Sequence, residues 1–125
     1  MNERICLICC ENLCFLVAAG FPTGQYNIES KVKEINFALQ SGASEIDIVI
    51  SRCLVIGERW EELYNEISVL KQACGQATMK TILAVGECGS LENVYKASMV
   101  AMMAGSDYIK TSTGTYSNHM RHFPA

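Results

Sequence analysis

Short apolar segments recur along the chain, separated by longer stretches in which apolar residues return with a helical period. Four of the short segments are apolar runs, mostly β-branched or small, that end at glycine or in hydroxyl-rich turns. Runs of this length and composition predict strands that are buried in a sheet. The predicted strands cover residues 14–19, 45–50, 79–85 and 106–114, the last one running into a glycine-ended loop.

The stretches between these strands predict three helices. The first has apolar residues at steps of four, three and four from Ile28 to Leu39, and a glycine follows its end. The second runs as one long amphipathic helix from Ile56 to Cys74. The third begins after Ser90, a residue type that caps helix N-termini, and its small-residue body indicates close packing on a sheet.

Strand and helix therefore alternate, and the strand centres near residues 17, 48, 82 and 109 lie roughly 30 residues apart. This spacing is typical of right-handed βαβ units in a parallel sheet. Two closures stay open on the pattern alone: a small doubly wound sheet, or part of an eight-stranded barrel, whose complete form needs about 250 residues. The first strand ends GFPTGQ, so the glycine-rich dinucleotide signature G-x-G-x-x-G is absent there.

Length and charge narrow the class of protein. The 125 residues are enough for one domain with a real core, and half of them are hydrophobic, which excludes a disordered chain. The net charge of −3, without a basic stripe, argues against a nucleic-acid partner. The net negative charge is still compatible with a small anionic substrate, because single lysines can bind such a substrate locally.

The apolar run at residues 5–21 has two interpretations. It resembles a signal peptide or membrane span, and Val17-Ala18-Ala19 fits a cleavage site. However, Glu11 interrupts the run, and Glu3 cancels the charge of Arg4 where a signal peptide needs positive charge. We therefore expect a buried strand with an apolar lead-in and no membrane partner.

The seven cysteines also have two interpretations. The spacing Cys6-x-x-Cys9 could begin a zinc site, which would need a second pair of ligands elsewhere in the chain. The favoured interpretation is reduced, buried thiols in a cytoplasmic protein without a metal. The other cysteines and the two histidines are Cys10, Cys14, Cys53, Cys74, Cys88, His119 and His122.

Candidate chemistry comes from ionisable residues inside the predicted strands. Asp47 interrupts the second strand, Lys80 lies in the third, and Lys110 lies in the fourth. Burying an unpaired charge is expensive, so such residues are either paired or functional. Two structural explanations therefore remain as alternatives to a catalytic role: an Asp–Lys ion pair, or a lysine whose ammonium reaches solvent at the end of a strand.

The position of Lys110 favours function. It ends its strand, where barrel active sites are assembled, and is followed by the turn Thr111-Ser112-Thr113-Gly114, whose N–H groups could bind a phosphate. A second ammonium group from Lys80 would disfavour the charge of Lys110 and so favour the neutral amine that forms a Schiff base with a carbonyl. Asp47 could then transfer protons, directly or through a water. These are the groups that an imine-forming aldolase requires.

Four blocks of sequence carry a resemblance to a known family. They are VAAGFPTGQ (17–25), GASEIDIVI (42–50), KTILAVGE (80–87) and YKASMVAMMAGSDYIKTSTG (95–114). On these blocks, residues 17–114 resemble deoxyribose-phosphate aldolase, and most closely its animal forms. The resemblance implies an α/β fold, a TIM barrel, and reversible cleavage of 2-deoxyribose 5-phosphate to glyceraldehyde 3-phosphate and acetaldehyde in deoxyribonucleotide breakdown. It implies no metal and no cofactor.

The resemblance also implies roles for individual residues. Lys110 matches the Schiff-base lysine of the KTSTG motif, and Asp47 matches the aspartate that donates and accepts protons through a water. Lys80 matches a supporting lysine in the same pocket. Gly114 matches a glycine that contacts the phosphate of the sugar phosphate substrate.

The chain departs from the family pattern at both ends, so residues 1–125 are expected to form one partial barrel domain with atypical ends at 1–16 and 115–125. Thr115 stands where the family usually has a lysine, and no F-K-P-A-G-G segment with a second catalytic lysine follows. We expect four parallel strands with three intervening helices. The alternative function is an inactive, truncated form that self-associates or pairs with full-length aldolase.

Overall fold

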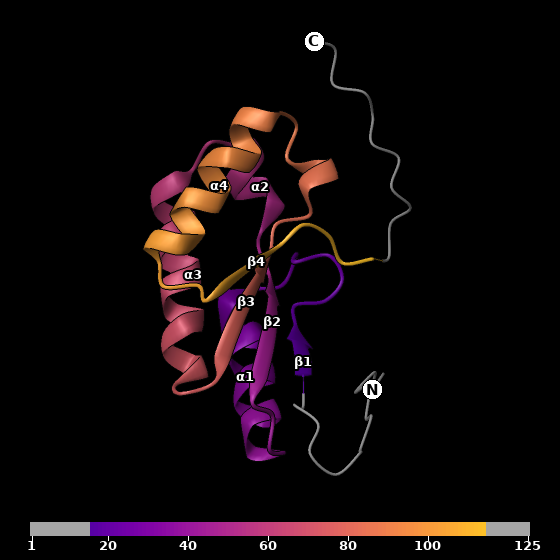
Figure 1. Cartoon of the computed structure of the whole chain (residues 1–125), viewed down its shortest axis with the longest axis vertical. Coiled ribbons are helices and arrows are strands. Elements are labelled where there is room, and N and C mark those ends of the chain that lie inside the picture. Colours follow the sequence, from indigo (N-terminus) through magenta and orange to yellow (C-terminus); the bar gives the residue numbers. More distant parts are fainter. Residues whose placement is uncertain (1–15, 115–125) are drawn as a thin grey trace.

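The computed structural model describes residues 16–114, which form a four-stranded sheet with helices between successive strands (Figure 1). In chain order the elements are β1 (Leu16–Ala19), α1 (Ile28–Gln40), β2 (Glu45–Val49), α2 (Arg52–Ile56), α3 (Trp60–Cys74), β3 (Thr78–Ile82), the 3₁₀-helix η1 (Val85–Glu87), α4 (Leu91–Met103) and β4 (Tyr108–Lys110). The predictions for residues 1–15 and 115–125, including the N-terminal cysteine cluster, both histidines and the N-terminal part of the apolar run, lie outside the described residues.

All neighbouring strands are parallel, and their order in the sheet is β1-β2-β3-β4. The predicted alternation of strand and helix is therefore confirmed. Residues of α1, α3 and α4 pack in one cluster with the strands, so the helices cover the same side of the sheet. This is the arrangement of consecutive units of a β/α barrel, and the described residues contain four such strands. Within residues 16–114, no helix is long and apolar enough to cross a membrane.

Two helix N-termini are capped by side chains. Asn27 accepts a hydrogen bond from the Ser30 amide at 2.8 Å and so caps α1. Ser90 accepts one from the Asn93 amide at 3.1 Å, which confirms the predicted start of α4. These bonds satisfy amides that have no partner within the first helical turn.

The single long helix predicted from Ile56 to Cys74 is wrong. The structure has a short helix, α2, that ends at Ile56, and a second helix, α3, that begins at Trp60. Glu58 between them has a left-handed backbone with φ of 53°, which breaks the helical path. The Arg59 amide donates to the Leu54 carbonyl at 2.8 Å and closes the turn. The apolar period continues across this turn, which is why the pattern suggested one helix.

Two strands are shorter than predicted. β3 ends at Ile82 instead of residue 85, because Ala84 has a left-handed φ of 53° and η1 follows it. Leu83 is nevertheless buried, and its amide donates to the Lys110 carbonyl at 2.9 Å. β4 is confined to three residues of the predicted segment 106–114.

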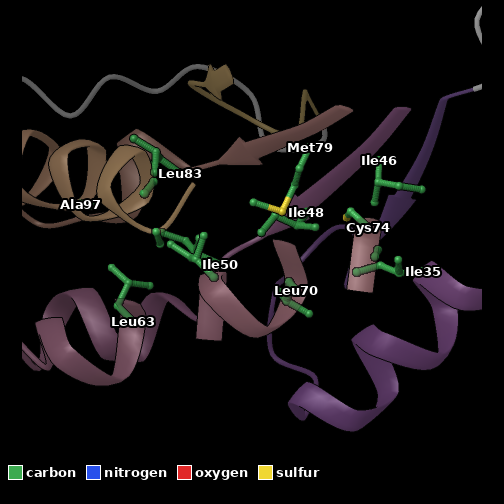
Figure 2. Packing of buried hydrophobic residues seen from close by; sticks show 14 of the residues in the cluster. Ile35, Ile46, Ile48, Ile50, Leu63, Leu70, Cys74, Met79, Leu83 and Ala97 are labelled. Atoms are coloured by element: carbon green, nitrogen blue, oxygen red, sulfur yellow. The ribbon is translucent and has the colours of Figure 1, made fainter. Parts of the chain in front are cut away.

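The core lies between the sheet and the helices (Figure 2). Alternate strand residues such as Ile48 and Met79 face Leu70 of α3, and Ile35 of α1 and Ala97 of α4 extend this layer. Because side chains alternate along a strand, the residues between them face the other side of the sheet. This second face contains the ionisable strand residues Asp47, Lys80 and Lys110.

Candidate active site

Asp47, Lys80 and Lys110 project from the same face of the sheet. Asp47 on β2 is the register partner of Lys80 on β3, and Lys110 on β4 is the partner of Ile82, two residues further along β3. Register partners in a parallel sheet, and residues two apart on one strand, share a face. The three side chains that the sequence singled out are therefore on the face opposite the helix-covered core.

Lys110 and Asp47 form an ion pair across β3, between Nζ of Lys110 and Oδ2 of Asp47. Asp47 is buried, with 3% of its surface exposed, whereas the side chain of Lys110 keeps 40% exposed. The other carboxylate oxygen, Oδ1, is buried and has no hydrogen-bond partner among the described residues. A partly exposed lysine thus lies against a buried carboxylate that has one oxygen without a hydrogen-bond partner among the described residues.

Lys80 has a different partner from the one that the sequence suggested. Its ammonium contacts Oε2 of Glu45, two residues before Asp47 on β2, and lies 6.0 Å from the centre of the Tyr108 ring. The two lysines lie on the same face of neighbouring strands, and each ammonium contacts a carboxylate of β2. The reason is register: Glu45 and Asp47 both face this side, and each lysine reaches one of them.

The structural interpretation that the sequence left open, an Asp–Lys ion pair, is present in the structure. This pair is compatible with a chemical role, because 40% of the Lys110 side chain is exposed. Asp47 is in direct contact with the nitrogen that would have to lose a proton if Lys110 acted as a nucleophile. A proton acceptor at hydrogen-bonding distance from a nucleophile is the geometry that covalent catalysis needs.

Gly114 ends the described part of the chain, four residues after Lys110. Its backbone is left-handed, with φ of 75°, and a Cβ there would meet no atom within 4 Å. Glycine adopts this conformation without strain, so the residue type is explained by the turn. The Val85 amide donates to the Thr111 carbonyl at 2.8 Å and joins the start of this turn to the first residue of η1.

Sequence reasoning missed two charged residues that the structure pairs across elements. One is Glu45, which alternation with Asp47 could have placed on the same face. The other is Lys31, which is completely buried in α1 and pairs with Glu66 of α3 at 2.6 Å. The burial of Lys31 could have been predicted from its spacing, because it lies four residues before Ile35 and seven before Ala38 and so shares the buried face of α1.

The described residues include no cluster of three or more histidine, cysteine or carboxylate side chains that could hold a metal ion. A surface pocket of about 360 Å³ lies between α1, α2 and α3, lined by residues such as Tyr26, Leu54 and Val69. Lys110 and Asp47 do not line it. The candidate chemistry therefore belongs to the polar sheet face and not to this pocket.

Comparison with known proteins points to one family. Residues 14–124 match the family described as DeoC/LacD family aldolase. The human deoxyribose-phosphate aldolase is 61% identical to the chain over 98 residues, which are 78% of this chain and 31% of the human protein.

Solved structures agree with this match. The aldolase QR15 superposes with a TM-score of 0.82 at 30% identity, covering 86% of this chain and 48% of that one. The tetrameric deoxyribose phosphate aldolase from Aeropyrum pernix superposes with a TM-score of 0.71 at 33% identity, covering 81% of this chain and 42% of that one. The chain thus spans about a third of the length of the human relative and less than half of these two aldolase structures.

Proposed function

Because the chain belongs to the DeoC/LacD aldolase family, we propose that it carries the Schiff-base chemistry of a deoxyribose-phosphate aldolase. The reaction is the reversible cleavage of 2-deoxy-D-ribose 5-phosphate to D-glyceraldehyde 3-phosphate and acetaldehyde. The observation that supports this most is the contact between the exposed Lys110 and the buried Asp47 on the polar face of the sheet.

Lys110 is the nucleophile in this proposal. Its neutral Nζ attacks the aldehyde carbon C1 of the open-chain sugar, and loss of water from the resulting carbinolamine gives a protonated imine. The C2–C3 bond then breaks as the C3 hydroxyl loses its proton, and the electron pair passes into the iminium to form an enamine. Glyceraldehyde 3-phosphate leaves; protonation of the enamine at C2 and hydrolysis of the imine release acetaldehyde and regenerate Lys110. The balance needs no oxidant or reductant.

Asp47 is the proton acceptor and donor. It already contacts Nζ of Lys110 through Oδ2, while its buried Oδ1 can accept a hydrogen bond from a water or from a substrate hydroxyl. Positioning of this kind contributes several kcal/mol to lowering a barrier. Lys80, paired with Glu45 on the same face of the sheet, has a supporting role beside Lys110 and Asp47 in this proposal. Gly114, in the turn after β4, is proposed to contact the substrate phosphate.

The partner in this proposal is a small sugar phosphate, and the compartment is the reducing cytoplasm. The three cysteines among residues 16–114, Cys53, Cys74 and Cys88, are free thiols, which supports such a compartment.

A second candidate function is association without turnover. Within residues 16–114, β1 and β4 each pair with one strand only, so each leaves an outer edge open. Such edges pair readily with other strands, and a copy of this chain or a full-length aldolase could supply them. In this case the chain would bind aldehydes weakly or not at all, and its role would be that of a binding partner.

Reductive trapping separates the two candidates. The chain is incubated with acetaldehyde, or with 2-deoxyribose 5-phosphate, and borohydride reduces any imine to a stable secondary amine that is mapped by mass spectrometry. Lys96 is the matched internal control, because its side chain is also 40% exposed and is also paired with a carboxylate, Glu92.

We expect Lys110 to be labelled at least tenfold faster than Lys96, and Lys110→Arg to remove this preference. Labelling spread evenly over the surface lysines would reject the aldolase proposal. Turnover of 2-deoxyribose 5-phosphate near that of a complete aldolase, abolished by Lys110→Ala, would reject the proposal of a non-catalytic partner.

A further inference from the structure

Lys31 is a buried charge that the proposed chemistry does not use. None of its surface is exposed, and its ammonium donates three hydrogen bonds: to the Val49 carbonyl at 2.9 Å, to Oγ of Ser51 at 3.2 Å and to Oε1 of Glu66 at 2.6 Å. An ammonium has three protons, so its hydrogen-bonding capacity is complete. Two of the acceptors lie at or just after the end of β2: Val49 is two positions beyond Asp47, and Ser51 is four positions beyond it.

Glu66 of α3 also binds the residues that follow β2, through two hydrogen bonds from Ser51. Its Oε2 accepts from the Ser51 amide at 3.1 Å, and its Oε1 from Oγ of Ser51 at 2.6 Å. Ser51 is the N-cap residue of α2, yet its side chain makes no capping bond. A serine at this position normally caps its helix. Here its hydroxyl is instead part of the network around Lys31 and Glu66.

The loop after β1 rests on the same network. Oγ of Ser51 lies 3.3 Å from the Gly24 carbonyl, and a Cβ on Gly20 would stand only 3.0 Å from Cε of Lys31. A Cβ on Gly24 would overlap the Ile50 carbonyl. The glycines of the VAAGFPTGQ block are therefore needed for close packing of this loop against Lys31 and the end of β2.

We propose that Lys31 and Glu66 are positioning residues that fix the carboxyl end of β2, and through it the Asp47 carboxylate, against Lys110. The inference rests on the proposed function. A buried ion pair adds little stability compared with apolar side chains of similar volume, but its directional bonds fix the backbone from Val49 to Ser51. Asp47 lies on the same strand, two residues before that anchor. A small displacement of the strand would move its carboxylate away from Nζ of Lys110.

The first test measures this geometry without relying on activity. The coupling free energy between Lys110 and Asp47 is obtained from a double-mutant cycle of Lys110→Met and Asp47→Asn, by urea unfolding at one fixed protein concentration. The cycle is repeated in the backgrounds Lys31→Met, Lys31→Arg, Ser51→Ala and Lys71→Met. Lys71→Met is the matched control, because Lys71 pairs with Asp107 at 2.6 Å and Asp107 accepts from the Met79 amide, at the opposite end of the sheet.

We expect the coupling to fall by more than half in Lys31→Met, to be retained in Lys31→Arg and to be unchanged in Lys71→Met. Ser51→Ala keeps the ion pair but removes its hydroxyl links, and it should lower the coupling by a smaller fraction. If Lys31→Met does not fold, Ser51→Ala shows whether the coupling between Lys110 and Asp47 depends on the network around Lys31. Equal coupling in the Lys31→Met or Ser51→Ala background and in the Lys71→Met background would overturn the proposal.

The second test measures the consequence, as the rate of borohydride-trapped labelling at Lys110 relative to Lys96. It should fall at least tenfold in Lys31→Met and stay unchanged in Lys71→Met. A fall of equal size in both variants would mean that the pair serves stability only. If the unsubstituted chain forms no adduct at Lys110, the proposed function fails, and the coupling measurement alone decides whether Lys31 positions Asp47.

Discussion

At the scale of single residues, Lys110 and Lys80 on the polar face have different surroundings, in line with the different roles that the sequence suggested for them. Lys110 combines an exposed ammonium with a buried carboxylate partner, whereas Lys80 pairs with Glu45 and lies near the Tyr108 ring. A buried carboxylate partner and a side chain that is 40% exposed are the features on which the proposed role of Lys110 as the nucleophile rests. Lys80 has the position of a neighbour that shapes the same face.

Gly24 offers a direct test of the loop packing at this scale. Its φ of 70° and the overlap of any Cβ with the Ile50 carbonyl predict that Gly24→Ala is strongly destabilising, by more than about 2 kcal/mol. Gly42→Ala is the control, because Gly42 also has a positive φ but a Cβ there would meet no atom within 4 Å, so that the substitution costs only about 1–2 kcal/mol. Urea unfolding compares the two, and equal losses would contradict the packing described for the loop.

Asp107 predicts a pH dependence of stability. A hydrogen bond from Lys71, and a second from the Met79 amide, lower the pKa of Asp107 below its ordinary value of 3.8. A carboxyl with a lowered pKa in the folded state stabilises the protein above pH about 4, and this contribution disappears as the pH falls through the folded-state pKa.

The parent chain should therefore lose more stability than Asp107→Asn when the pH is lowered from 5 to 3. The difference should stay below about 1 kcal/mol, because the pair is partly exposed to solvent. Urea unfolding at several pH values measures it, and parallel curves for the two proteins would disprove this role of Asp107.

At the scale of elements, helix boundaries depend on capping groups that the sequence partly reveals. Ser90 behaves as its sequence position suggests and caps α4, whereas Ser51 precedes α2 without capping it, because its hydroxyl is bound to Glu66. The same residue type at the same helical position thus has two roles. Which role it takes depends on the groups within reach of the hydroxyl: Oγ of Ser51 accepts from the Lys31 ammonium and donates to Glu66, whereas Oγ of Ser90 accepts from the Asn93 amide.

Removal of the α4 cap should destabilise the chain by about 1 kcal/mol, the usual effect of replacing a capping serine with alanine. The change is Ser90→Ala, measured by urea unfolding. Ser98→Ala is the control inside the same helix: its hydroxyl donates to the Val94 carbonyl, one turn before it, and alanine is the better helix former. A loss from Ser98→Ala as large as that from Ser90→Ala would contradict the capping explanation.

At the scale of the whole molecule, the sheet formed by residues 16–114 has an unpaired edge at β1 and another at β4 within that range, and an apolar face of α4 lies beside β4. An apolar stripe on α4 lies at a spacing of about one helical turn and consists of Leu91, Tyr95, Met99, Met102 and Met103. Tyr108 on the neighbouring β4 is 61% exposed. Exposed strand edges and contiguous apolar surface both favour association.

We therefore predict that the 125-residue chain self-associates in solution. Analytical ultracentrifugation over a range of concentrations should show species larger than the monomer, and the double variant Met102→Lys/Met103→Lys should weaken the association at least tenfold. Glu61→Lys/Glu62→Lys on the polar surface of α3 is the matched control and should leave it in place. A strict monomer with a sharply cooperative thermal transition would contradict this prediction.

The sequence predicted the existence, type and order of the main strands and helices, and it predicted less well where they end. Ile82 ends β3 although apolar residues continue to Val85, because the backbone of Ala84 is left-handed, with φ of 53°. Glu58 interrupts a continuous apolar period with a single left-handed residue. Both errors come from local backbone geometry that hydrophobic periodicity does not encode.

The sequence by itself determined the β/α alternation and placed Asp47, Lys80 and Lys110 in strands, because periodicity and composition act over a few neighbouring residues. The tertiary structure alone decided which charges meet. Lys110 and Asp47 are 63 positions apart in the chain, and Lys80 and Glu45, like Lys31 and Glu66, are 35 positions apart. These pairings follow from strand register and from the packing of α1 on α3, which depend on the whole chain and not on any local pattern.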